Sequence, residues 1–75
     1  METLHKRIIK NFEDKINDLL QNSLIRTFVS DNRWTITIFK KEQSDTLAEN
    51  LTTHEARDIL EIILRVLEYE YEEMP

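Results

Sequence analysis

The sequence predicts a single small α+β domain over residues 1–75, with two helices packed on one face of a two-stranded antiparallel sheet. Two observations favour this class. Hydrophobic residues recur every three or four positions near both ends of the chain, which is the period of a helix face, and they alternate with polar residues in the middle, as in strands. The hydrophobic share is 40%, which is high enough for a folded core.

The first predicted helix covers residues 4–22. Its apolar residues span about 160° of the helix surface and should face the core. They are Leu4, Ile8, Ile9, Phe12, Ile16, Leu19 and Leu20. Asn22 is expected close to the end of this helix, because asparagine tolerates the left-handed conformation that terminates helices.

Residues 24–29 and 34–40 are predicted to be the two strands of a β-hairpin, since both are rich in β-branched and aromatic residues. A turn centred on Asp31 and Asn32 sets the register. The expected pairs are Val29 with Trp34, Thr27 with Ile36, and Ile25 with Ile38. These six residues should meet the helices, and the opposite face would carry Leu24, Arg26, Phe28, Thr35, Thr37 and Phe39.

The polar segment 42–49 is expected to be a loop, with a short third strand at residues 47–51 as the alternative. The second predicted helix covers residues 53–73. Thr52 and Glu55 have the spacing of a capping box, in which each side chain accepts a hydrogen bond from the other residue's backbone N–H.

The second helix has two apolar stripes, more than a two-stranded sheet and one helix can cover. The first stripe contains Ala56, Leu60, Ile63, Leu67, Tyr71 and Met74, with Leu64 on its flank. The second contains Ile59, Ile62, Val66 and Tyr69. Either the helix is buried on most sides, or the second stripe mediates self-association, and we expect a homodimer. The predicted core comprises Leu4, Ile8, Phe12, Ile16, Leu19, Trp34, Ile36, Ile38, Leu60, Ile63 and Leu67.

We expect no enzymatic activity, no cofactor and no metal site. The chain has no glycine for a phosphate-binding loop and no cysteine for thiolate chemistry. His54 and Asp58 approach the zinc-protease helix signature, but an aspartate stands where the second histidine belongs. His5 is interpreted as a partly buried residue of the first helix.

Charge is distributed unevenly along the chain. Residues 24–41 contain four basic residues and one acidic residue, whereas residues 42–75 contain ten acidic and two basic residues. Asp58, Glu61, Glu68 and Glu72 form a candidate acidic face that could imitate a row of phosphates toward a basic partner, or simply interact with water. Because of these acids, nucleic-acid binding by the basic hairpin is the less favoured hypothesis.

These features predict a small regulatory protein that docks on another protein, with Leu24, Arg26, Phe28 and Phe39 as the candidate partner surface. The alternative is a structural subunit of a larger, virion-type assembly. The element order resembles that of the small head–tail joining protein of lambda-type phages, but that family is basic, so only topology is compared. In composition the chain resembles accessory proteins of phages and mobile elements. With no apolar run of membrane-spanning length and no export signal, we expect a cytoplasmic location without membrane contact.

Overall fold

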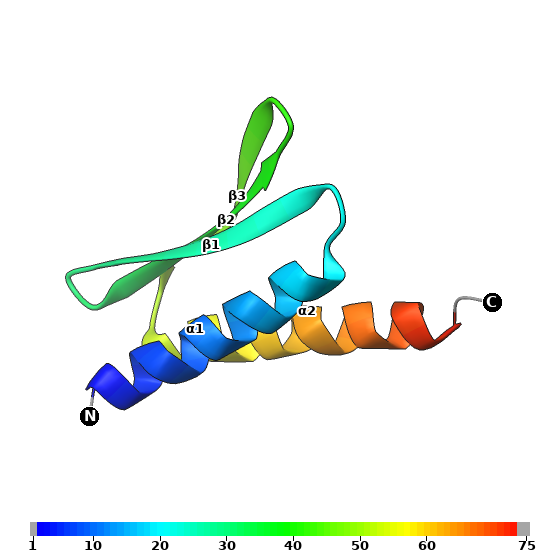
Figure 1. Ribbon diagram of the computed structural model, residues 1–75. Coiled ribbons are helices and arrows are strands. Elements are labelled where there is room, and N and C mark those ends of the chain that lie inside the picture. Colours follow the sequence, from blue (N-terminus) through cyan, green and yellow to red (C-terminus); the bar gives the residue numbers. More distant parts are fainter. Residues whose placement is uncertain (1, 74–75) are drawn as a thin grey trace.

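The computed structural model describes the backbone of residues 2–73 and the side chains of residues 4–70. The elements follow the order α1 (Glu2–Leu19), β1 (Ser23–Ser30), β2 (Arg33–Lys40), β3 (Gln43–Leu51) and α2 (Thr53–Glu73). The strands form one antiparallel sheet in the order β1-β2-β3, and both helices lie on one side of it (Figure 1). The α+β class is therefore confirmed, whereas the prediction of a two-stranded sheet is wrong.

The first hairpin has the predicted register. Val29 pairs with Trp34, and the pairing continues without a shift to Ser23 and Lys40. Asp31 and Asn32 have φ angles of 51° and 61°, the left-handed values that a two-residue type I′ turn requires at both positions. Since side chains alternate along a strand, this turn fixes which residues of β1 and β2 face the helices.

Strand β3 occupies the segment that was expected to be mostly loop. It pairs with β2 from the Lys40–Gln43 pair to the Trp34–Leu51 pair, with two register shifts on the way. Leu51 is buried and Ala48 packs on the core, while residues 43–47 are all exposed. Backbone pairing with β2 thus holds β3 in place without an alternating apolar face. For this reason the pattern indicated only the short strand at residues 47–51, as the alternative, whereas β3 covers Gln43–Leu51.

Helix α1 ends at Leu19 and not at residue 22, because β1 already begins at Ser23 and the connection is short. Its last turn is closed by the Leu20 N–H, which donates to the Ile16 carbonyl at 3.0 Å. The two helices lie side by side and run in the same direction, with their N-terminal ends at the same end of the molecule (Figure 1).

Helix α2 has the predicted bounds, and its capping box is formed. The Glu55 N–H donates to Thr52 Oγ1 at 3.2 Å, and the Thr52 N–H donates to Glu55 Oε1 at 2.9 Å. Two of the N–H groups that a helix start leaves without intrahelical partners are therefore satisfied by side chains.

The core lies between the sheet and the two helices. Of the predicted core residues, Ile16, Trp34, Ile36 and Leu60 are buried. Ile8, Phe12, Leu19, Ile38, Ile63 and Leu67 are half-buried. The buried core also includes Ile9, Ile25, Leu51, Ala56 and Leu64. The assignment of Leu4 to the core is wrong, since it is 58% exposed. The buried face of α1 is centred near Ile9, about 140° around the helix from Leu4.

Candidate interaction surfaces

The face of the sheet turned away from the helices carries an exposed apolar patch. Leu24 and Phe39 are direct cross-strand partners, and Phe28 lies four residues after Leu24 on the same face of β1, opposite Thr35. Leu24, Phe39 and Phe28 are 37%, 38% and 52% exposed. Both helices pack on the other face of the sheet, so in the part of the chain that the structure describes no element covers this patch (Figure 1).

We call this face the outer face, and the pairing assigns ten residues to it. They are Leu24, Arg26, Phe28, Ser30, Arg33, Thr35, Thr37, Phe39, Ser44 and Thr46. The charged residues among these ten are Arg26 and Arg33, and Arg26 is paired with Glu13 of α1. The exposed Glu49 lies in the irregular part of β3, next to this face. The outer face is thus apolar and weakly positive, and it contains all four residues of the predicted partner surface.

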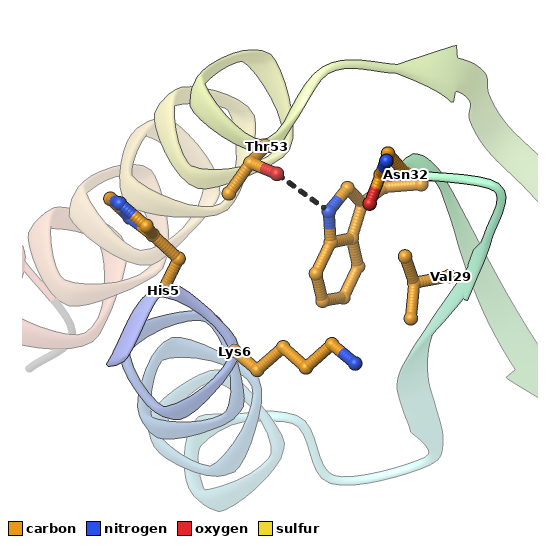
Figure 2. A pocket seen from close by; sticks show the side chains of 6 residues that line it. His5, Lys6, Val29, Asn32 and Thr53 are labelled. Atoms are coloured by element: carbon orange, nitrogen blue, oxygen red, sulfur yellow. Dashed lines mark hydrogen bonds between the residues drawn. The ribbon is translucent and has the colours of Figure 1, made fainter. Parts of the chain in front are cut away.

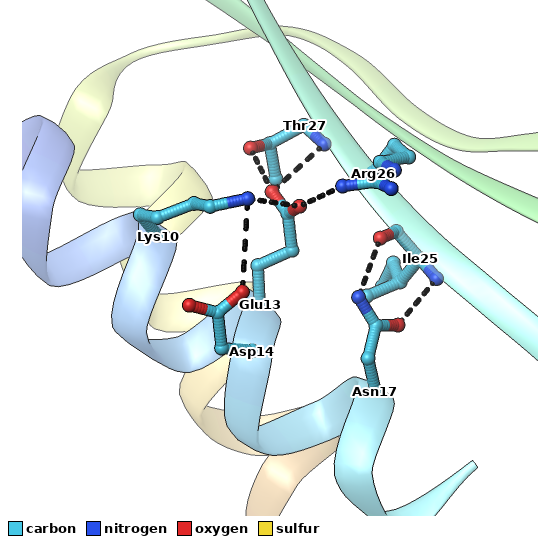
Figure 3. Close-up of polar contacts among 7 residues, drawn as sticks. All are labelled: Lys10, Glu13, Asp14, Asn17, Ile25, Arg26 and Thr27. Atoms are coloured by element: carbon cyan, nitrogen blue, oxygen red, sulfur yellow. Dashed lines mark hydrogen bonds and ion pairs between the residues drawn. The ribbon is translucent and has the colours of Figure 1, made fainter.

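The free edge of β1 is closed by polar side chains from α1 (Figure 3). Glu13, only 2% exposed, accepts hydrogen bonds from the Thr27 Oγ1 hydroxyl at 2.6 Å and from the Thr27 N–H at 3.3 Å. Its other oxygen pairs with Arg26 Nη1 and Lys10 Nζ, each at 3.3 Å. Four donors therefore satisfy a carboxylate that would be costly to bury alone.

Asn17 completes this edge. Its side-chain amide accepts from the Ile25 N–H at 2.7 Å and donates to the Ile25 carbonyl at 3.1 Å (Figure 3). An amide side chain here makes the two hydrogen bonds that a neighbouring strand would otherwise make. Strand addition at β1 is thereby blocked over Ile25 and Thr27.

The opposite edge belongs to β3, and it is irregular. The two register shifts interrupt the ladder, and Asn50 adopts a left-handed φ of 57° within this stretch. Asp45 and Glu49 add negative charge to the same strand. Bulges and charges of this kind are devices that keep an edge strand from pairing with another chain. Both edges are therefore poorly suited to strand addition.

A second exposed apolar surface lies on α2. Ile62, Val66 and Tyr69 are 61%, 52% and 67% exposed, and we call these three residues the α2 stripe. The alternative in which the helix buries all of this surface within its own fold is wrong. Ile59, the fourth predicted member, packs on the core instead.

The candidate acidic face falls only partly within the described side chains. Asp58 and Glu68 are exposed, and Glu61 is half-buried and paired with Arg65 at 3.1 Å. Glu72 lies outside the described side chains, as do Tyr71 and Met74 of the first stripe. Glu70 is also exposed, so acidic residues lie on both sides of the α2 stripe.

A small cavity of about 40 Å³ lies between the start of α1, the β1–β2 turn and the start of α2. Figure 2 shows Lys6 extending from α1 toward the turn and the hydrogen bond that Trp34 Nε1 donates to Thr53 Oγ1 at 3.1 Å. Beside it, the His5 and His54 rings meet edge to face with centroids 5.9 Å apart. The volume of this cavity suits a few water molecules and is too small for a substrate.

Among the described residues, no three histidine, aspartate or glutamate side chains are grouped so as to hold a metal ion. The pKa of Glu55 is lowered because its carboxylate accepts hydrogen bonds from the Thr52 backbone and side chain, with a small contribution from Arg33. This shift results from helix capping.

The sequence reasoning missed the role of Glu13 and Asn17. The sequence does contain a signal for Glu13. It lies four residues after Ile9 and three before Ile16, and this spacing places it on the buried face of α1. A carboxylate in such a position needs hydrogen-bond donors, and Thr27 and Arg26 of β1 supply them together with Lys10 of α1.

Comparison with protein-family models, with curated proteins and with solved structures returned no match. Neither helix, over the residues described, is long and apolar enough to cross a membrane.

Proposed function

We propose that the protein is a non-enzymatic binding protein that docks on another protein through the outer face of its sheet. The supporting observation is the exposure of Leu24, Phe28 and Phe39 together on a face that the helices leave open. Contiguous apolar surface on a small protein commonly marks a contact site. Since both edges resist strand addition, the partner would bind to the face and not extend the sheet. We place this docking in the cytoplasm, in a regulatory or phage-type accessory role.

A second candidate function is that of a structural subunit in a larger assembly. The α2 stripe favours it, because a subunit needs two contact surfaces and this stripe is separate from the outer face. Nucleic-acid binding has weaker support. Trp34 is buried and so offers no ring for base stacking, and Arg26 is already paired with Glu13.

The test compares Phe28→Glu with Leu4→Glu. Both positions are more than half exposed, at 52% and 58%, but Leu4 lies on α1, away from the outer face. Tagged wild-type protein and both variants, each checked for folding by circular dichroism, are expressed in cells that produce the protein, cross-linked, and analysed by mass spectrometry. We expect one stoichiometric protein with the wild type and Leu4→Glu, and its loss with Phe28→Glu.

Retention of the same protein by Phe28→Glu would overturn docking through the outer face. A set of virion or other assembly proteins in place of one regulator or enzyme would favour the structural subunit. Recovery of nucleic acid that depends on Phe28 would favour the third hypothesis.

A further inference from the structure

We propose that the outer face of one copy receives the α2 stripe of a second copy, so that the protein associates head to tail. This inference shares the outer face with the proposed function and adds a specific occupant for it. It follows from three properties of the two surfaces: their apolar content, their charges, and their places on the molecule.

The apolar parts of the two surfaces match in length. Ile62 and Tyr69 are seven residues apart on a helix, or about 10 Å along its axis. Leu24 and Phe28 are four residues apart on a strand, or about 13 Å. One helix laid across the outer face could therefore bring its three exposed apolar side chains against the three of the sheet.

The charges of the two surfaces are complementary. Arg33 is an exposed cation of the outer face, and the α2 stripe is flanked by the exposed Asp58 and Glu70. Arg26 already pairs with Glu13, so only part of its charge is available to a partner. Arg65, the basic residue beside the stripe, is already paired with Glu61. A symmetric contact of two α2 stripes would bring acids against acids, and two outer faces would bring arginines together. The mixed contact sets opposite charges against each other.

The two surfaces cannot meet within one chain. Ile62 lies about 160° around α2 from Leu60, which points into the core, so the stripe faces away from the sheet. The outer face also points away from the core, on the side of the sheet without helices (Figure 1). Each copy that joins therefore leaves one surface of each kind free at the two ends, and association can continue beyond a dimer.

The experiment uses three full-length variants, two for the outer face and one for the α2 stripe. Phe28→Glu disables the outer face, with Phe39→Glu as a second variant of the same face, and Ile62→Glu with Val66→Glu disables the α2 stripe. All four positions are exposed, and circular dichroism verifies the fold of each variant. Sedimentation velocity measures the assembly state of each protein alone and of an equimolar mixture.

We expect the wild type to form species larger than dimers as its concentration rises into the high micromolar range. Each variant alone should stay monomeric, because it lacks one of the two surfaces. Their mixture should form a one-to-one heterodimer, since one variant keeps the intact stripe and the other the intact outer face. Raising the salt concentration, or adding Arg33→Glu to the stripe variant, should weaken this heterodimer several-fold.

Other results would overturn the proposal and identify what replaces it. A dimer of Phe28→Glu alone would indicate a symmetric contact of α2 stripes, and a dimer of the stripe variant alone would indicate a symmetric contact of outer faces. A wild-type protein that stays monomeric would exclude self-association. In that case the proposed function would still stand if capture of a partner in cells depends on Phe28.

Discussion

Glu13 occupies a position where the hydrophobic pattern of α1 would place an apolar side chain. The structure shows why a carboxylate is stable there: Thr27 gives it two hydrogen bonds, and Lys10 and Arg26 keep their own charges partly in water. The residue thus connects helix packing to the closure of a strand edge. Its contacts with Thr27 and Arg26 fix the position of α1 along β1.

Removing this carboxylate should destabilise the protein. We predict that Glu13→Ala lowers the free energy of unfolding by about 1–3 kcal/mol, because the Thr27 N–H and hydroxyl lose their buried acceptor. Asp14→Ala is the matched control, since Asp14 pairs with the same Lys10 at 3.6 Å but its side chain is 61% exposed. That control should change stability by less than about 0.5 kcal/mol in urea titrations followed by circular dichroism. Equal losses would mean that the Glu13 contacts do not hold α1 on the sheet.

Glu55 gives the helix cap a pH dependence. Its pKa lies below the ordinary value of 4.5 because the charged carboxylate accepts hydrogen bonds from Thr52. A group whose pKa is lower in the folded state stabilises the fold above its unfolded-state pKa, and this contribution disappears as the pH falls through the folded-state pKa. The stability difference between wild type and Glu55→Ala should therefore be constant at neutral pH and shrink below about pH 4.5. A difference that stays the same down to pH 3 would contradict a charge-dependent cap.

At the scale of elements, the first hairpin was predictable from its turn residues. The full extent of β3 was not, because its sequence carries no strand pattern. Asp31 and Asn32 define a two-residue turn, and one known turn sets every pair of β1 and β2. Gln43–Leu51 has neither an alternating apolar pattern nor a run of β-branched residues. Its place in the sheet depends on the exposed backbone of β2, which a pattern of side chains does not reveal.

The turn residue Asn32 can be tested directly. Its φ of 61° is a conformation that glycine adopts freely and that a β-branched residue strongly resists. We predict that Asn32→Gly leaves thermal stability unchanged or raises it slightly, while Asn32→Val lowers the free energy of unfolding by about 1–2 kcal/mol. The comparison needs thermal melts of the two variants and the wild type under one condition. Equal stability of the two variants would show that the type I′ turn does not limit hairpin formation.

For the whole molecule, the hydrophobic pattern predicted which elements surround the core, but not which of their apolar residues are buried. It identified both helices and the two strands of the first hairpin, and the predicted core contained four of the nine buried hydrophobic residues, Ile16, Trp34, Ile36 and Leu60. It placed Leu4 in the core because it could not show that α1 turns its Ile9–Ile16 face toward β1 and α2. The exposure of the α2 stripe was likewise undecided in the sequence, because periodicity alone does not tell a buried second face from a free one.

A domain of 75 residues has little stability to spare, so its core should be sensitive to truncation. Leu60 is fully buried between the helices and the sheet. Leu60→Ala should cost about 2–5 kcal/mol, enough to leave a marginal domain largely unfolded at room temperature. Leu4→Ala removes the same atoms from an exposed site and should leave the melting temperature nearly unchanged. A Leu60→Ala protein that melts like the Leu4→Ala protein would contradict the core described above.

The closure of β1 by Glu13 and Asn17 has a consequence for how the protein fails. An edge sealed by another strand opens only when the sheet unfolds, whereas an edge sealed by side chains opens when one helix detaches. Local unfolding of α1 would uncover the N–H and carbonyl groups of Ile25, together with the part of the core that Ile9 and Ile16 cover. The species with α1 detached is therefore the one exposed to domain swapping and fibril growth. Its population depends on the core contacts of Ile9 and Ile16 as well as on the polar contacts of Glu13 and Asn17.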